Sequence, residues 1–107
     1  MTDDAITPIE LKDRIDRGER LRVLDVRNPD EVAICRIAGS TVIPFTELPD
    51  RLGELDRESP LVVHCKGGGR SQKAVALLRQ AGFAHVQNLT GGILAWIRDV
   101  DPRLTPY

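Results

Sequence analysis

Short runs of apolar and β-branched residues recur along the chain. Runs of this kind are typical of buried parallel strands, because both faces of such strands are covered by other elements. They occupy residues 22–26, 41–43, 61–65 and 85–89. A weaker run at residues 5–6 predicts one more strand, at the edge of the sheet.

Helical patterns fill the segments between these runs. Two helices begin with a capping box that has proline at its first helical position, at Thr7–Glu10 and at Asn28–Glu31. Gly18 is placed to end the first of them. Further helices are expected at residues 49–55, at 71–82, where Ser71 opens the helix and Gly82 follows it, and at 90–100, where Thr90 is the cap.

The alternation of strands and helices, joined by short connections, is typical of an α/β domain. We expect a mainly parallel five-stranded sheet with helices on both faces. The 107 residues are the length of one domain, and neither a linker nor an internal repeat divides them. The sequence therefore predicts a single domain over residues 1–107.

Composition argues against several classes of protein. The 15 basic and 16 acidic residues nearly cancel and form no long basic run, so we expect no nucleic-acid partner. The apolar runs are too short to span a membrane, and the first ten residues do not resemble a secretion signal, which predicts a cytoplasmic protein. Cys35 and Cys65 are then expected to be free thiols, and their spacing from the two histidines gives no metal motif.

Chemistry is concentrated between one predicted strand and the next helix, in residues 65–71, which we call the cradle loop. Cys65 ends the strand, Ser71 opens the helix, and Gly67, Gly68 and Gly69 lie between them. Ligands of parallel sheets bind at the carboxyl ends of the strands. Glycines let backbone amides turn toward a ligand at a helix N-terminus, so the pattern predicts an anion-binding loop.

The same loop would activate the thiol of Cys65. A helix N-terminus, inward amides and the cations Lys66 and Arg70 all favour the thiolate, which is the nucleophilic form. The alternative is that Cys65 is a small buried residue and the glycines form an ordinary turn. Three glycines between two cations favour the reactive interpretation.

The length of the loop indicates which anion it suits. Four residues separate Cys65 from Arg70, whereas the cysteine phosphatases have one residue more. A tighter ring of amides suits a single extra sulfur on Cys65 better than a tetrahedral phosphate. Two alternatives stay open: a phosphatase or arsenate-reductase-like enzyme, and a binding module whose cysteine is idle.

Four motifs together resemble the rhodanese-like sulfurtransferase domains. They are LDVRNPDEV, CRIAGSTVIP, VVHCKGGGRS and AGFAHVQNLTGGILAW. Arg36 stands where the family usually has histidine, and the tail VDPRLTPY extends beyond Trp96. Both details are similar to the C-terminal rhodanese domains fused to E1-like adenylyltransferases, which serve sulfur-carrier proteins of molybdopterin, thiamin or tRNA thiolation.

The resemblance implies a two-step transfer with no cofactor. Cys65 would take a sulfane sulfur from a donor such as thiosulfate or a protein persulfide, and an acceptor would remove it. The amides of residues 66–71 and the guanidinium of Arg70 would hold the persulfide, and Lys66 would attract an anionic donor. A sulfur-carrier protein or an E1-like adenylyltransferase is the implied partner. Asp25 and Arg27 would brace the site.

Two further residues could be mistaken for parts of the site. Strand alternation directs His64 away from the side of Cys65, so we expect a packed core histidine. Cys35 follows apolar residues of a short helix and is expected to be a buried structural thiol, with a resolving role toward Cys65 as the alternative.

Overall fold

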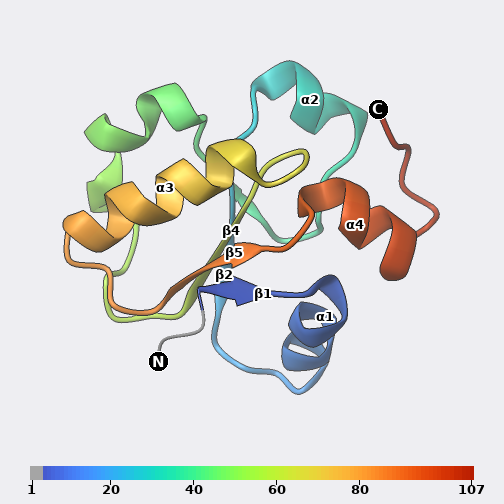
Figure 1. Cartoon of the computed structure of the whole chain (residues 1–107), viewed down its shortest axis with the longest axis horizontal. Helices are drawn as coiled ribbons and strands as arrows, with labels where there is room; N and C mark the ends of the chain where they lie inside the picture. Colours follow the sequence, from blue (N-terminus) through green and yellow to red (C-terminus); the bar gives the residue numbers. More distant parts are fainter. Residues whose placement is uncertain (1–3) are drawn as a thin grey trace.

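A computed structural model describes residues 4–107. Five strands form one parallel sheet in the order β1-β5-β4-β2-β3, with helices on both faces, so the predicted fold is confirmed (Figure 1). The strands are β1 (Ala5–Ile6), β2 (Arg22–Asp25), β3 (Thr41–Val42), β4 (Leu61–His64) and β5 (Val86–Leu89). β4 lies at the centre of the sheet between β5 and β2, and Cys65 follows it directly.

The described residues form four α-helices, of which the first three connect strands and the last follows β5: α1 (Pro8–Asp16), α2 (Pro29–Ile34), α3 (Gly69–Gln80) and α4 (Gly92–Asp99). α1 begins with the predicted capping box, in which the amide of Glu10 donates to Thr7 Oγ1 at 3.2 Å and the amide of Thr7 donates to Glu10 Oε1 at 3.0 Å. Gly18 and Gly82 follow α1 and α3 with φ of +76° and +97°, the left-handed conformation expected just after a helix.

Three predicted helix positions are wrong. The segment at 49–55 is not one helix but lies in two 3₁₀ helices, η1 (Phe45–Asp50) and η2 (Leu52–Glu54), with Pro49 inside the first. α3 begins at Gly69 instead of Ser71, because Gly68 takes the cap position. α4 is capped by Gly91 instead of Thr90. Both caps are glycines with positive φ, Gly68 at +118° and Gly91 at +76°.

Two clusters of buried side chains cover the two faces of the sheet. Side chains of α3 and η1 belong to one cluster and side chains of α1 and α4 to the other. Figure 1 shows α3 and α1 on opposite sides of the sheet. Successive residues of β4 alternate between the clusters, with Val62 in the second and Val63 in the first. Cys65 belongs to the first cluster, so the loop that carries it is anchored in the core. No helix within residues 4–107 has the length and apolar character needed to cross a membrane.

Candidate active site

The cradle loop folds back on the sulfur of Cys65. Gly68 has φ of +118°, a conformation that residues with a side chain rarely adopt, and its amide donates to Cys65 Sγ at 3.1 Å. Ser71, in the first turn of α3, places its Oγ 3.4 Å from the same sulfur. The predicted inward amides and the helix N-terminus therefore meet at Cys65, only 2% of whose surface is exposed.

A second hydrogen bond fixes the hydroxyl of Ser71. It donates to Asn88 Oδ1 at 2.6 Å and lies 3.1 Å from the carbonyl oxygen of Gly68. Asn88 comes from β5 and was not among the predicted site residues, because nothing near it in the sequence marks it. Since a hydroxyl can rotate among acceptors, Ser71 can turn its proton to the sulfur when Cys65 ionises.

The electrostatic balance at Cys65 favours the thiolate. Burial raises the pKa of the thiol, but hydrogen bonds from the Ser71 side chain and from the backbone amides of Ser71, Gly68 and Arg70 lower it. The net result is a pKa below the ordinary value for cysteine. Backbone and hydroxyl donors therefore favour the thiolate, while the contribution predicted for the charges of Lys66 and Arg70 stays a prediction.

Arg70 contributes its backbone to the sulfur and its side chain to a carboxylate. Its guanidinium forms a bidentate ion pair with Glu31 of α2, with N–O distances of 2.7 and 2.8 Å. This pair lowers the pKa of Glu31 to about 2. Glu31 was predicted only as a helix cap, a role it also fills by accepting from the amide of Asn28 at 3.1 Å. The contact of the guanidinium with a terminal sulfur stays a prediction.

Tyr107 bridges the Arg70–Glu31 ion pair and the buried ion pair of Asp25 with Arg27. Its hydroxyl donates to Glu31 Oε2 at 2.8 Å and accepts from Arg27 Nη1 at 3.1 Å. Burial raises the pKa of Tyr107 to about 12, so the hydroxyl keeps its proton at neutral pH. Sequence reasoning missed Tyr107, because its partners lie 76 and 80 residues away.

Asp25 and Arg27 form the buried ion pair of the site. Both side chains are fully buried, 2.7 Å apart at their closest atoms, and Arg27 also donates to the carbonyl oxygen of Cys35 at 2.7 Å. Asp25 lies opposite His64 in the register of β2 and β4, one residue before Cys65. The bracing role predicted for them is consistent with these contacts and stays a prediction.

His64 is the packed core histidine that the sequence predicts. It is fully buried, and its Nδ1 lies 3.2 Å from the carbonyl oxygen of Cys65. Its Nε2 lies 3.6 Å from Asp25 Oδ2, beyond hydrogen-bond distance, and burial lowers the pKa of the ring. Cys35 is buried and, like Cys65, free. Within residues 4–107 no group of three or more His, Cys, Asp or Glu side chains could hold a metal ion.

The start of α4 is hydrogen-bonded to the backbone of the cradle loop. We call residues 91–94 the α4 clasp. The amides of Ile93 and Leu94 donate to the carbonyl oxygens of Cys65 and Lys66, at 2.9 and 3.3 Å. Gly92 has φ of +63°, and a Cβ there would collide with both of these carbonyl groups. Gly92, the second glycine of the TGG motif, is therefore required by the close approach of α4 to the loop.

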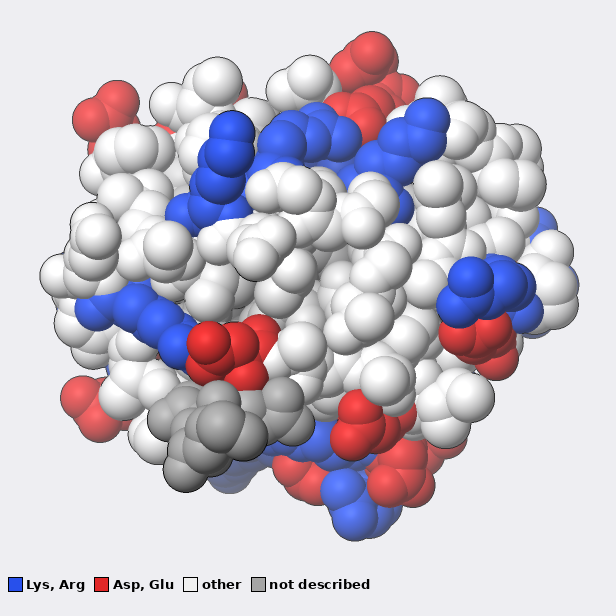
Figure 2. All heavy atoms as spheres, in the orientation of Figure 1, with Lys and Arg blue, Asp and Glu red and all other residues white. Residues whose placement is uncertain are grey.

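Lys66 lies at the outer side of the site. Its ammonium nitrogen lies 4.6 Å from the centre of the Tyr107 ring. Figure 2 shows basic atoms gathered over the cradle loop and the first turn of α3. Gly67 and Gly69 are exposed, so the outer surface of the loop presents backbone between Lys66 and Arg70.

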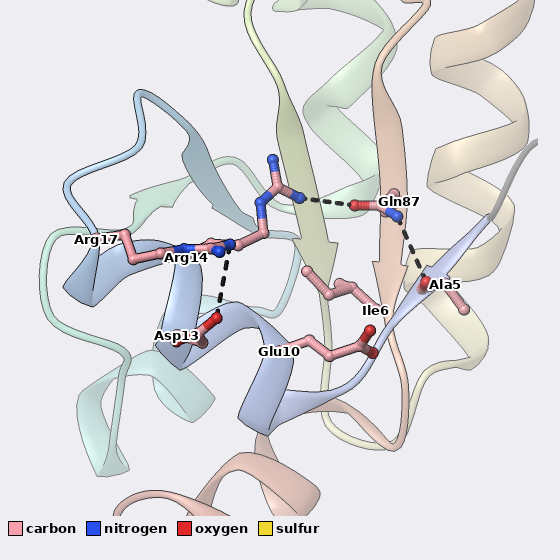
Figure 3. Close-up of a pocket in the computed structure, with 7 residues that line it drawn as sticks. All are labelled: Ala5, Ile6, Glu10, Asp13, Arg14, Arg17 and Gln87. Atoms are coloured by element: carbon pink, nitrogen blue, oxygen red, sulfur yellow. Dashed lines mark hydrogen bonds and ion pairs between the residues drawn. The ribbon is translucent and has the colours of Figure 1, made fainter.

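A separate pocket lies between α1, β1 and β5 and contains none of the predicted site residues (Figure 3). Its cations are already paired: Arg14 donates to Gln87 at 3.1 Å and to Glu19 at 2.9 Å, and Arg17 lies 3.6 Å from Asp13. Such paired charges give no reason to assign a ligand to it, and the cradle loop is the candidate active site.

Comparison with known proteins agrees with this geometry. Residues 7–99 match the rhodanese-like domain family. The chain is 38% identical over 105 residues to the probable adenylyltransferase/sulfurtransferase MoeZ of Mycobacterium tuberculosis, covering 96% of this chain but only 27% of that protein. It is 35% identical to a sulfurtransferase of Allochromatium vinosum, covering 90% of each chain.

Among solved structures, the chain resembles the rhodanese-related protein of Thermoplasma volcanium, with a TM-score of 0.82 and 35% identity over 90% of this chain and 92% of that one. The motif of cysteine, four residues and arginine, and the fold that presents it, thus agree with the sequence comparisons. The chain belongs to the rhodanese-like domain family.

Proposed function

We propose that the protein is a sulfurtransferase that carries a sulfane sulfur as a persulfide on Cys65. The observation that supports this most directly is the position of Cys65 Sγ, which receives the amide of Gly68 at 3.1 Å and faces the hydroxyl of Ser71 at 3.4 Å. These donors stabilise negative charge on sulfur without a separate general base. Lys66, Gly67, Gly69 and Arg70 complete the proposed binding loop.

The first step transfers sulfur to the protein. The thiolate of Cys65 attacks the sulfane sulfur of thiosulfate, a new S–S bond forms, and the S–S bond of thiosulfate breaks. Sulfite leaves with the electron pair of the broken bond. The terminal sulfur of the persulfide then carries the negative charge, and the amides of the cradle loop are placed to stabilise it.

The second step returns Cys65 to its starting state. A nucleophilic acceptor attacks the terminal sulfur, the Cys65–sulfur bond breaks, and the thiolate leaves with the electron pair. No cofactor takes part in this scheme, because the cysteine itself carries the sulfur. A small donor suits the site, since Cys65 is nearly buried and exposed glycines border it.

The physiological acceptor that we propose is a sulfur-carrier protein. The relative MoeZ is named as an adenylyltransferase and a sulfurtransferase, and this chain spans 27% of its length. An E1-like adenylyltransferase, fused or separate, is accordingly the proposed partner. Two free cysteines within the described residues suit a reducing compartment, and we propose the cytoplasm.

The test is to incubate the protein with thiosulfate and then with cyanide. We expect thiocyanate, and a mass gain of one sulfur on Cys65 before cyanide is added. Cys65→Ser should abolish both results, whereas Cys35→Ser, which removes the other buried thiol, should keep them. Absence of thiocyanate and of the mass gain with several persulfide donors would refute the proposal. Hydrolysis of an aryl phosphate that disappears in Cys65→Ser would support the phosphatase alternative instead.

A further inference from the structure

Three cations surround the cradle loop, and they differ in how their charge is balanced. Arg27 is paired with Asp25 at 2.7 Å and Arg70 with Glu31 at 2.7 Å. Lys66 has no carboxylate partner among residues 4–107, and its recorded contact there is the face of the Tyr107 ring. Lys66 therefore supplies the uncompensated positive charge beside Cys65.

Tyr107 is itself held in place. Its hydroxyl oxygen accepts from Arg27, and its hydroxyl proton is donated to Glu31 of α2. The hydroxyl of Tyr107 therefore has a partner both as acceptor and as donor. Its ring, with Leu104, packs against the buried cluster that includes α1 and α4. These contacts fix the plane of the ring toward Lys66.

From this arrangement we propose that Tyr107 is a positioning residue of the sulfur-transfer reaction, one that holds the Lys66 ammonium for the anionic sulfur donor. The inference rests on the proposed function and adds a residue that determines use of the donor. A lysine side chain is long and loses much rotamer freedom when it is ordered, so a preformed contact lowers the cost of binding. An aromatic face attracts the ammonium without cancelling its charge, as a carboxylate would.

This arrangement predicts an effect on one half of the reaction only. In the donor half, thiosulfate must approach with its negative charge. In the acceptor half, dithiothreitol is mostly uncharged near neutral pH and attacks through its small thiolate fraction, so Lys66 attracts it far less than it attracts the dianion thiosulfate. Burial raises the pKa of Cys65, and Ser71 and the amides of residues 68, 70 and 71 lower it; the Tyr107 ring is not among these causes, so its loss should leave the pKa unchanged.

The experiment compares Tyr107→Leu and Tyr107→Phe with the wild type. For Tyr107→Leu we expect kcat/KM for thiosulfate to fall about fivefold at low salt, with kcat/KM for dithiothreitol unchanged. Tyr107→Phe keeps the ring but loses the hydroxyl bridge, and a smaller fall of about twofold is expected. Both differences should shrink at high salt, because screening weakens attraction between exposed charges.

A double-mutant cycle tests whether Tyr107 acts through Lys66. In a Lys66→Gln background, Tyr107→Leu should have no further effect on kcat/KM for thiosulfate. Arg103→Gln is the matched control, since it removes a cation from the same tail, where that side chain is 89% exposed and paired with Asp101. Its kinetics should equal those of the wild type.

Three results would overturn the inference: unchanged use of thiosulfate in Tyr107→Leu, additive effects in the cycle, or an equal loss in both halves of the reaction. An equal loss accompanied by a lower melting temperature would mean that Tyr107 only stabilises the fold. These results require a wild type that forms the persulfide. A wild type that forms none contradicts the proposed function itself, so the two failures are distinguishable.

Discussion

The β4–α3 loop and the β5–α4 loop both carry glycines with positive φ, yet they use the amides of the following helix differently. In the cradle loop, amides at the start of α3 are directed at Cys65 Sγ. In the α4 clasp, the amides of Ile93 and Leu94 are bound to carbonyl oxygens of the cradle loop itself. One helix start therefore faces a reactive atom, and the other is saturated by protein. A helix N-terminus is an anion site only where its donors are left free of protein partners.

Among the variants considered, Gly92→Ala should most strongly disrupt the contact between the α4 clasp and the cradle loop. A Cβ at this position would collide with the Cys65 and Lys66 carbonyl groups, and the positive φ adds strain. We expect a loss of about 3 kcal/mol or more in the free energy of unfolding, measured by urea denaturation, together with loss of sulfur transfer. Gly67→Ala is the matched control, because a Cβ there meets nothing within 4 Å, and its change should stay below about 0.5 kcal/mol. Equal stability of the two variants would contradict the proposed clasp.

Gly68→Ala tests the cradle side with a smaller steric effect. A Cβ on Gly68 has room, with Asn88 Nδ2 at 3.8 Å, but its φ of +118° is strained for alanine. We expect a loss of about 2 kcal/mol in the free energy of unfolding. The amide should also move away from Cys65 Sγ, so the pKa of the thiol should rise in a pH titration of its alkylation by iodoacetamide. An unchanged titration in a destabilised variant would show that this amide does not stabilise the thiolate.

Ser71→Ala leaves the backbone intact and removes one donor. Because a hydrogen bond to a charged group contributes about 1.5 kcal/mol, the fraction of thiolate at neutral pH should fall about tenfold. The rate of alkylation at pH 7 measures that fraction. Ser71→Thr, which keeps the hydroxyl, should retain most of the rate. If Ser71→Ala reacted as fast as the wild type, backbone amides alone would account for the activation.

The cradle loop, unlike the α4 clasp, carries an ion pair, formed by Arg70 with Glu31 of α2. Glu31→Gln tests what this ion pair contributes to stability. The pKa of Glu31 is lowered to about 2 from an ordinary value of 4.5, so the contacts of its carboxylate stabilise the fold above pH 4.5 and are lost as the pH falls through about 2. We expect Glu31→Gln to be about 1 kcal/mol less stable than the wild type at pH 7. The difference should vanish near pH 2 in urea titrations across this range. A difference that persists there would assign the effect to packing instead of charge.

The residues that sequence reasoning identified share a local signal. Cys65, the glycines and Arg70 lie within one short stretch, and the spacing from Cys65 to Arg70 carries the information. The strands were predictable because short runs of apolar and β-branched residues mark them locally. Thr90 was misjudged as a cap and Ser71 as the start of its helix, because a hydroxyl residue ahead of an apolar helix is the usual signal of a helix start and glycine is a weaker one.

The residues that were missed act across long separations. Asn88 reaches Ser71 from the neighbouring strand, and Tyr107 reaches Glu31 across 76 residues. Neither has a neighbour in the sequence that reveals its partner, since each contact forms only between elements that the fold brings together: β5 with the start of α3, and the C-terminal tail with α2. Glu31 was recognised as a cap, but a cap signal says nothing of a second contact made by the same carboxylate.

The two ends of the described chain leave the molecule at different places, which decides where a tag, a surface linker or a fused protein can be joined. Asp4 pairs with Arg79 in the last turn of α3, whereas the cradle loop lies at the first turn of that helix (Figure 1). Tyr107 contacts Lys66 beside Cys65. A tag attached ahead of residue 4 leaves Cys65 accessible, whereas a tag attached after residue 107 lies next to Cys65. Immobilisation from the first end therefore suits binding measurements, and attachment at the second would deliver a fused acceptor directly to the sulfur.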